Sequence, residues 1–240
     1  MSAHCCCFLL FDECDKLVKD ADYRSDITLP IDDFFKFDQK ALVSATPIEL
    51  HDPRFKEQNF QTIEIQPTFD YKKEIWLHHT NNTLQAFKNV LSKLDNEEVA
   101  PLPICVFINS TDIIYSLMKQ LDLLEESAVF CAPKSVDKLK KNRFCNAYEQ
   151  WSKDKMKRYN FFTSRFFNAV DMELEEQPHV IMLTDVYFAE HTMIDPYTDA
   201  IQIVGRFRNG VSSITYISNT KKGLSQRSKE EIKGYLICSK

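Results

Sequence analysis

The sequence predicts an α/β protein whose strands form a parallel sheet covered by helices. Short apolar runs recur along the chain, and segments with apolar residues at helical spacing lie between them. Polar and acidic residues follow directly after several of these runs. Ligands bind at the carboxyl ends of parallel strands, so residues at those ends are the first candidates for function.

Seven strands are expected, two near the N-terminus and five further along the chain. They are 5–12, 40–46, 104–109, 128–132, 160–163, 180–185 and 213–218. A charged, less regular segment after Pro67 is interpreted as a connector that includes Trp76, His78 and His79. The chain is therefore expected to divide into a unit of residues 1–66 and a unit of residues 67–240.

One helix is expected after the strand at 104–109. Its apolar residues repeat at helical spacing, and Asn109 or Ser110 is available as the N-cap. The apolar residues are Ile113, Ile114, Leu117, Met118 and Leu121.

A second helix is expected to begin at Asp195-Pro196, because Asp is a good N-cap and Pro is favoured at the first helical position. Gly210 is expected to end it. The helical spacing predicts that Ala200, Ile203, Val204 and Phe207 are buried, and that Gln202, Arg206 and Asn209 lie on the opposite face.

Composition indicates a globular protein, since 44% of the 240 residues are hydrophobic. No run of about 18 apolar residues is present, so no membrane span is expected. The first residues lack a basic region and a cleavage site, which points to the cytoplasm. The eight cysteines form no Cys-x-x-Cys pair and are expected to be reduced thiols packed as small hydrophobes.

The net charge of −5 argues against a protein that binds nucleic acid through its overall charge, but the charge is uneven. Residues 134–165 hold 10 Lys or Arg and 3 acids. Lys140, Lys141 and Arg143 in this segment are candidates for contacts with nucleic-acid phosphates. The alternative is that they form a solvated helical face.

The stretch FLLFDECDK places Asp12, Glu13 and Asp15 directly after an apolar strand. Ser44 and Thr46 follow the next expected strand. Carboxylates in this position suit a magnesium ion, which takes one or two carboxylates and keeps several waters. A second carboxylate could orient or deprotonate a water molecule. Alternatively, the acids only cap a helix N-terminus.

Five short motifs in this order resemble those of superfamily 2 helicases of the DExD/H-box type. DECD at Asp12–Asp15 is similar to motif II, and SAT at Ser44–Thr46 is similar to motif III. FINS at Phe107–Ser110 lies where motif IV is expected. TSRFFNAVD at Thr163–Asp171 resembles motif V, and QIVGRFRNG at Gln202–Gly210 resembles motif VI.

The resemblance implies RecA-like domains that bind ATP, Mg²⁺ and a DNA or RNA strand. It implies that Asp12 holds the magnesium ion and that Glu13 activates water. Arg206, with Arg208 as an alternative, would be the arginine finger on the γ-phosphate. The other implied residues are Asp15, Ser44, Thr46, Asp171 and Gln202 for the nucleotide, and Thr163 and Arg165 for the nucleic acid.

The chain departs from the family pattern in three places. Asn209 stands where motif VI has its final arginine, and Ala169 replaces the motif V glycine. A phosphate-binding Gly-x-x-x-x-Gly-Lys-Ser/Thr loop before motif II is ruled out, because all four glycines lie in the last 36 residues. They are Gly205, Gly210, Gly223 and Gly234.

We therefore expect the C-terminal portion of a helicase, with motifs II and III in a partial first RecA-like domain and motifs IV to VI in a second. This chain alone is predicted not to hydrolyse ATP. The expected partners are DNA or RNA, and also the missing N-terminal half or another subunit. The alternatives are a non-catalytic nucleic-acid-binding module and a regulatory protein that supplies Arg206 to a nucleotide site in another subunit.

Overall fold

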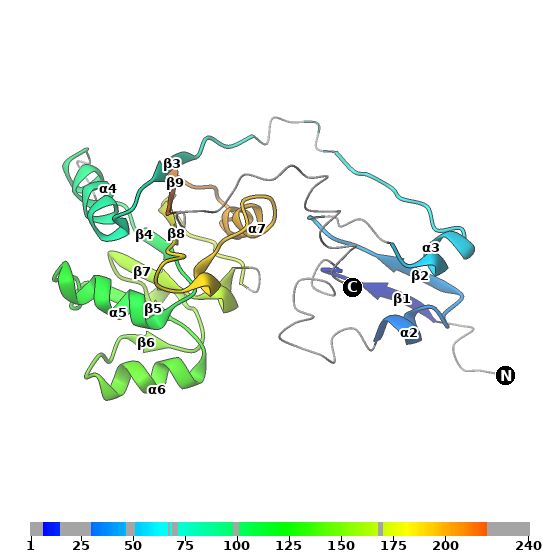
Figure 1. Ribbon diagram of the computed structural model, residues 1–240, viewed down its shortest axis with the longest axis horizontal. Helices are drawn as coiled ribbons and strands as arrows, with labels where there is room; N and C mark the ends of the chain where they lie inside the picture. The colour runs from blue at the N-terminus through cyan, green and yellow to red at the C-terminus, as the bar shows by residue number, and fades with distance from the viewer. Residues whose placement is uncertain are drawn as a thin grey trace. The chain divides into compact units, whose positions relative to one another are not determined.

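The computed structural model describes residues 7–14, 30–46, 51–66, 68, 72–97, 101–167 and 170–219. The chain forms two compact units, Met1–Lys72 and Lys73–Lys240 (Figure 1). Each unit has its own sheet and its own buried apolar residues, so each is described by itself.

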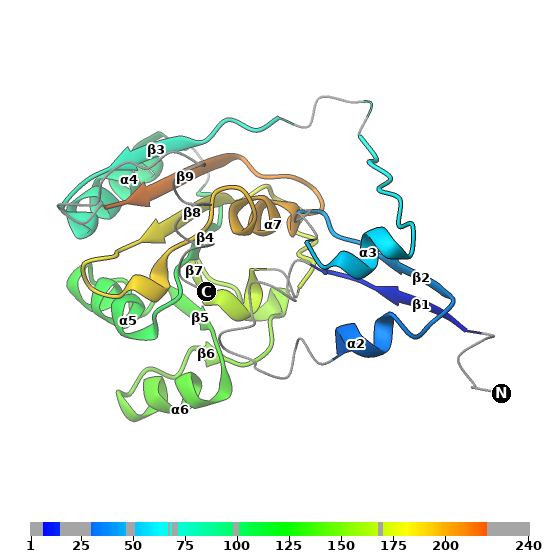
Figure 2. The same ribbon diagram turned by 45° about the vertical axis from the view of Figure 1, so that its right-hand side comes forward.

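The first unit contains a pair of parallel strands, β1 (Phe8–Phe11) and β2 (Gln39–Leu42), which lie side by side in Figure 2. Two short helices, α2 (Pro30–Phe34) and α3 (Pro53–Glu57), complete the described part of this unit. Its core consists of buried phenylalanines that meet edge to face or at a tilt. They are Phe34, Phe35 and Phe55, with Phe11 and Phe60 packed against them.

The strand expected at 5–12 is present as β1, but its apolar run is not buried throughout. Phe8 and Leu10 are exposed, whereas Leu9 and Phe11 pack against the phenylalanine cluster. Alternate residues of a strand point to opposite faces, and among the described residues only one face of this pair packs against the aromatic cluster.

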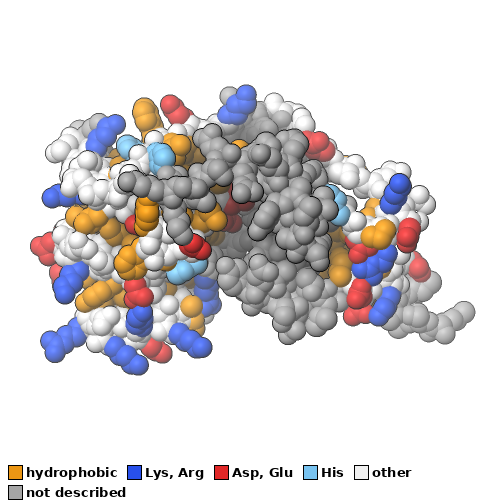
Figure 3. Space-filling model, in the orientation of Figure 1, with side chains coloured by type: hydrophobic (Ala, Val, Ile, Leu, Met, Phe, Trp, Pro, Cys, Tyr) orange, Lys and Arg blue, Asp and Glu red, His pale blue; other side chains and the backbone are white. Residues whose placement is uncertain are grey.

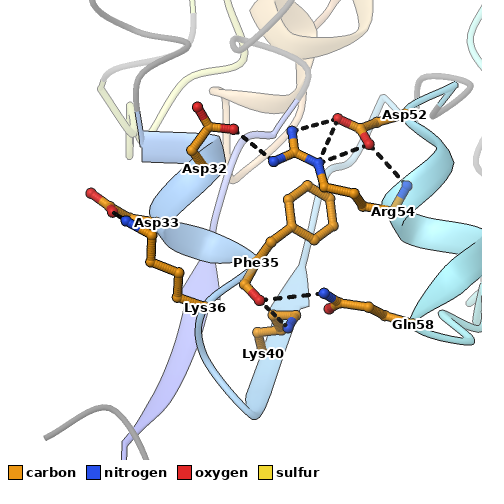
Figure 4. A network of polar contacts seen from close by, with 8 residues as sticks. All are labelled: Asp32, Asp33, Phe35, Lys36, Lys40, Asp52, Arg54 and Gln58. Atoms are coloured by element: carbon orange, nitrogen blue, oxygen red, sulfur yellow. Dashed lines mark hydrogen bonds and ion pairs between the residues drawn. The ribbon is translucent and has the colours of Figure 1, made fainter. Parts of the chain in front are cut away.

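A polar network joins α2, β2 and α3 over the phenylalanine cluster (Figure 4). The Arg54 guanidinium stacks 4.2 Å from the Phe35 ring centroid and donates hydrogen bonds to the carboxylates of Asp52 and Asp32. Lys40 Nζ donates to the backbone oxygen of Phe35 at 3.1 Å. These contacts connect α2, β2 and α3 to one another around a small core.

The second unit contains a parallel sheet of seven strands in the order β3-β9-β8-β4-β7-β5-β6. The bounds are β3 (Trp76–His79), β4 (Ile104–Phe107), β5 (Ser127–Phe130), β6 (Ala147–Tyr148), β7 (Tyr159–Phe162), β8 (His179–Thr184) and β9 (Ser213–Ser218). All residues of β4, β5, β7 and β8 are buried, as expected for parallel strands covered on both faces. The predicted fold class is confirmed.

Helices cover the two faces of this sheet. The longer helices α4 (Thr83–Glu97), α5 (Thr111–Gln120) and α6 (Pro133–Lys141) pack on one face, and α7 (Asp199–Gly205) packs on the other (Figure 1). Short 3₁₀ turns are η3 (Lys153–Lys155), η4 (Ser164–Phe166) and η5 (Glu190–Thr192). Val106 faces the first layer and Phe107 faces the second, because side chains alternate along a strand.

All five strands expected between residues 104 and 218 are present, each within two residues of the expected ends. The interpretation of Trp76, His78 and His79 as part of a connector is wrong, because Trp76–His79 is the edge strand β3. Its four residues are exposed. An exposed edge strand needs no continuous apolar run, which is the signal by which the inner strands were predicted. The short strand β6 was also missed.

The predicted helix after β4 is confirmed as α5. Ser110 is its N-cap, and the Ser110 hydroxyl oxygen accepts a hydrogen bond from the Ile113 N–H at 3.4 Å. Ile114 and Met118 are fully buried against the sheet.

The predicted bounds of α7 are wrong. The helix begins at Asp199, not at Asp195-Pro196, and it ends at Gly205. Gly210 lies beyond it in a turn with a φ of +86°, a value that favours glycine. Ala200, Ile203 and Phe207 are buried as predicted, whereas Val204 is half-buried.

Candidate functional site

The carboxyl ends of β1 and β2 bring the motif II and motif III residues to neighbouring positions. The ladder continues past the strands, since Val43 N–H donates to the Phe11 oxygen at 2.9 Å and Cys14 N–H donates to the Val43 oxygen at 3.1 Å. Asp12 and Glu13 therefore follow β1 beside the start of the segment that carries Ser44. The parallel pairing of the two strands thus brings these two segments together.

Each of these two loops is closed by a local hydrogen bond. Asp12 Oδ1 accepts from the Glu13 N–H at 2.8 Å, and the Glu13 backbone has a φ of +54°. Ser44 Oγ accepts from the Thr46 N–H at 3.1 Å, and Thr46 is buried. Asp15 lies outside the described residues.

Asp12 could supply one carboxylate ligand to a magnesium ion. Asp12 is exposed and offers hard carboxylate oxygens. The described part of the chain contains no group of three His, Cys, Asp or Glu residues arranged to enclose a metal ion. Magnesium commonly takes one or two protein carboxylates, with waters and phosphate oxygens as the other ligands.

The motif V and motif VI residues meet in the second unit around the Asp171 carboxylate. Arg208 Nη2 donates to both oxygens of Asp171 at 2.8 Å, and Arg206 Nη1 donates to Oδ1 at 3.3 Å. The side chains of Asp171 and Arg208 are half exposed, whereas that of Arg206 is mostly buried. One solvent-accessible carboxylate thus holds two guanidinium groups.

A parallel bridge between Met172 and Phe207 produces this arrangement. Met172 N–H donates to the Arg206 oxygen at 2.8 Å, and Arg208 N–H donates to the Met172 oxygen at 3.2 Å. Met172 and Phe207 point into the core. The side chains of Asp171, Arg206 and Arg208 meet on the other side of this bridge, where both arginines donate hydrogen bonds to the Asp171 carboxylate.

Arg208 does not continue the helix that was expected to run to Gly210. The helix ends at Gly205, and the following residues form the bridge with Met172. Arg206 and Arg208 therefore lie on the same side of the chain. Asn209 donates its amide to the Leu174 oxygen at 2.7 Å instead of facing this site.

The two arginines change the protonation of Asp171. The hydrogen bond and charge of Arg208, and then the charge of Arg206, hold the pKa of Asp171 below its usual value. The carboxylate therefore stays ionised at neutral pH and remains a partner for both guanidinium groups.

The expectation that Gln202 faces outward is wrong, because its side chain is 3% exposed. The outer face of α7 carries the exposed residue Ile201, and the next residue is turned by about 100° toward the sheet. The Gln202 backbone oxygen accepts from Arg206 Nε at 3.2 Å, so this residue contacts the arginine through its main chain. Ala169 lies outside the described residues.

Thr163 and Arg165 lie at the carboxyl end of β7, next to the motif IV residue Asn109. Thr163 is buried and Arg165 is exposed on the turn that follows. Asn109 Oδ1 accepts from the Ser164 N–H at 3.4 Å, and Asn109 Nδ2 donates to the His191 oxygen at 3.1 Å. Asn109 thus joins the loops that follow β4, β7 and β8.

The structure does not bring Lys140, Lys141 and Arg143 to the same edge of the sheet. Helix α6 starts just after the carboxyl end of β5 and returns to β6, which is parallel to β5. Its last residues therefore lie toward the amino ends of the strands, opposite to Thr163. Lys and Arg side chains gather over α6 along the lower margin of this unit in Figure 3.

A polar cluster at the carboxyl ends of β8 and β9 was missed by the sequence analysis. Asp185 accepts hydrogen bonds from the Thr83 hydroxyl at 2.6 Å and from Asn219 Nδ2 at 2.7 Å. Burial alone would raise the pKa of Asp185, but the hydrogen bonds to its carboxylate outweigh burial and lower it. The rule that selected Asp12, an acid directly after an apolar strand, also applies to Asp185.

The described cysteines agree in part with their predicted packing. Cys14, Cys105 and Cys131 are buried, whereas Cys7 and Cys145 are exposed, and all five are free thiols. Burial raises the pKa of Cys131 to about 11, so this thiol stays protonated at neutral pH.

Within the described residues, no helix has both the length and the apolar character needed to cross a bilayer.

Neither a protein-family model nor a curated protein sequence matches this chain. Solved structures do match this chain. A structure of S. cerevisiae Dbp5 bound to RNA and ADP BeF3 matches 95% of this chain and 56% of its own chain, with a TM-score of 0.51 and 15% identity. This chain thus spans little more than half the length of that protein. The C-terminal domain of the DEAD-box protein Dbp5 matches 68% of this chain and 84% of its own, with a TM-score of 0.38 and 14% identity.

The likeness to the first of these structures shows the fold of this chain. The seven-stranded parallel sheet flanked by helices is a RecA-like fold.

Proposed function

We propose that this chain is the part of an ATP-driven nucleic-acid helicase or translocase that contacts nucleotide phosphates through Arg206 and Arg208. The observation that carries this proposal is the placement of both guanidinium groups on one outer face beside Asp171. Guanidinium groups bind phosphate oxygens with matched geometry. Dbp5, which has this fold, is bound to RNA and ADP BeF3 in its structure.

The residues of the first unit have a complementary role in this proposal. Asp12 would hold Mg²⁺ together with waters and phosphate oxygens. The bound ion would neutralise developing charge on the phosphates. Glu13 would orient the attacking water, and Ser44 and Thr46 would respond to the nucleotide through the adjoining loop. Asp15, outside the described residues, keeps its proposed place in nucleotide binding.

Asp171 and Gln202 are proposed to act on the nucleotide through the arginines. Asp171 holds both guanidinium groups, and the Gln202 backbone oxygen holds the Nε of Arg206. Thr163 and Arg165 are proposed to contact the phosphates of a DNA or RNA strand, because an exposed arginine at the carboxyl edge can pair with them.

ATP hydrolysis by these 240 residues alone is not part of the proposal. A phosphate-binding loop uses glycines to bring backbone N–H groups against the phosphates. None of the four glycines precedes motif II. We therefore expect the hydrolytic activity to need groups that this sequence does not contain.

A second candidate is a non-catalytic nucleic-acid-binding module that uses Lys140, Lys141 and Arg143. These side chains are exposed and make no ion pair with another described residue. Other basic residues of the same segment are paired, for example Lys138 with Asp112 and Lys153 with Glu175.

Calorimetric titration with inorganic tripolyphosphate tests the role of the arginines. The double variant Arg206→Gln/Arg208→Gln is expected to weaken binding at least tenfold, because each charged hydrogen bond to a phosphate contributes about 1.5–3 kcal/mol. The matched control Lys140→Gln/Lys141→Gln removes the same charge from the other edge of the sheet. It should leave the affinity within about twofold.

An equal loss in both double variants would contradict the arginine site and indicate non-specific attraction by positive charge. A loss only in Lys140→Gln/Lys141→Gln would favour the second candidate.

A further inference from the structure

An open pocket lies at the carboxyl ends of β8 and β9, beside the start of α4. Its lining consists of two exposed aromatic rings and three polar side chains. They are Tyr187, Phe188, Asn81, Asp185 and Asn219. Phe188 is 69% exposed and Tyr187 is 51% exposed, although large apolar rings are usually covered.

The backbone that carries the rings is held in place by hydrogen bonds. Phe188 N–H donates to Asp185 Oδ1 at 3.2 Å, and Val186 N–H donates to Asn219 Oδ1 at 2.8 Å. Asn219 is buried and also donates to Asp185. Thr83 of α4 donates to the other oxygen of Asp185. These hydrogen bonds therefore hold the backbone that carries the two exposed rings.

The carboxylate of Asp185 is occupied by hydrogen bonds from the residues around it. Its two oxygens accept hydrogen bonds from Thr83, Asn219 and Phe188. Hydrogen bonds from three donors stabilise the charged form of this carboxylate within the protein. The amide of Asn81 makes no hydrogen bond with another described residue. This amide can both donate and accept at the rim of the pocket.

We propose that this pocket binds an unstacked base of a single-stranded nucleic acid. A base ring would stack on Phe188 and Tyr187, and the Asn81 amide would hydrogen-bond its edge. Unpaired bases are recognised by stacking on aromatic side chains and by polar contacts to their edges. The inference rests on the proposed function, since that function brings a strand to this edge of the sheet.

The pocket and the proposed phosphate contact at Arg165 lie on one connected surface. Asn109 links the turn that carries Arg165 to the loop after β8 through Ser164 and His191. One strand, β4, separates β7 from β8. The spacing of adjacent strands places their ends roughly 10 Å apart. A stacked strand covers that length in about three nucleotides.

The test compares two labelled strands of equal length, an oligothymidylate and an abasic strand with the same number of phosphates. Fluorescence anisotropy at low salt gives the affinity of the full chain for each. Phe188→Ala is expected to weaken binding of the oligothymidylate about 5- to 50-fold, because it removes base stacking. Its affinity for the abasic strand should stay unchanged.

Three further variants sharpen this result. Tyr187→Ala should act in the same direction as Phe188→Ala. Tyr197→Ala removes a ring that is 82% exposed but does not line the pocket, so it should leave both affinities unchanged. Arg165→Gln should weaken both strands equally, because it removes a phosphate contact.

Equal effects of Phe188→Ala and Tyr197→Ala, or no effect of Phe188→Ala, would overturn the base pocket and leave these rings as a surface for a protein partner. In that case a loss with Arg165→Gln would still support the proposed nucleic-acid contact. Absence of binding to both strands by the unaltered chain would overturn that contact and the base pocket together. Phe188 is exposed, so its truncation should cost little stability, and thermal unfolding checks this.

Discussion

At the scale of single residues, the placement of Arg208 decides how motif VI is interpreted. In the sequence, Arg208 is one position too early and Asn209 occupies the family position. In the structure, the bridge between Met172 and Phe207 turns Arg208 toward Asp171, on the same face as Arg206. The shortened motif therefore still presents two arginines together.

The pKa of Asp171 provides a direct measurement of this contact. We expect NMR titration of the Asp171 carboxyl carbon to give a pKa below the ordinary value of about 3.9. Arg208→Gln should raise it more than Arg206→Gln, because Arg208 donates to both oxygens at 2.8 Å and Arg206 donates to one at 3.3 Å.

The sign of the effect on stability follows from this shift. A pKa lowered by folding stabilises the protein above the unfolded-state pKa, and this stabilisation is lost as pH falls through the folded-state value. The control Arg165→Gln should leave the titration of Asp171 unchanged. A pKa of Asp171 that does not respond to Arg208→Gln would contradict the ion pair.

At the scale of elements, short capping signals and apolar spacing placed α5 correctly, because both act within a few residues. For α7 the same signals predicted the wrong start and end of the helix. Asp195 does cap locally, accepting from the Tyr197 N–H at 2.8 Å, but this hydrogen bond closes a turn before the helix begins. Asp residues favour turns as well as helix starts, and the sequence does not distinguish the two.

The N-cap of α5 is open to a stability test. Ser110→Ala should lower the free energy of unfolding of the second unit by about 1 kcal/mol, because it leaves an N–H group of the first turn without its side-chain acceptor. Urea unfolding followed by circular dichroism measures the change.

Ser116→Ala in the same helix is the matched control. Ser116 is exposed in the helix interior, and its hydroxyl accepts only from the Gln120 side chain among the hydrogen bonds described. The better helix propensity of alanine should keep this change within about 0.5 kcal/mol. Equal losses in the two variants would argue against a capping role for Ser110.

At the scale of the whole molecule, the chain has two units with separate apolar cores. In the described part of the first unit, the core consists of a few phenylalanines around two short strands. Small cores of this size stabilise a fold only weakly. We therefore expect the first unit to be the less stable of the two.

Hydrogen exchange measured by mass spectrometry tests the independence of the units. Phe34→Ala removes a fully buried ring and should cost about 3–5 kcal/mol, enough to abolish protection in β1 and β2. Protection in β4, β7 and β8 should be unchanged. Ile114→Ala, which empties a buried site in the second unit, should lower protection there and leave β1 and β2 as they were. Loss of protection in both units from either change would contradict separate cores.

The sequence by itself determined the fold class and the five inner strands of the second unit, but not its edge strands β3 and β6. Strands β4, β5, β7 and β8 are buried on both faces because helices cover both faces, and this apolar pattern can be recognised within four to six residues. The sequence also placed acids directly after β1 and polar residues directly after β2, and the parallel pairing of the two strands brings both sets to one edge.

Only the tertiary structure decided where the candidate site residues point. Asp171 contacts Arg208, which is 37 positions away in the sequence. Asp185 contacts Thr83, which is 102 positions away. The burial of Gln202 depends on the rotation of α7 against the sheet. Lys140 and Arg165 share a basic segment but lie at opposite edges of the sheet, because α6 runs antiparallel to the strands. Periodicity is local, whereas these placements depend on contacts between distant segments, and a single sequence does not specify such contacts position by position.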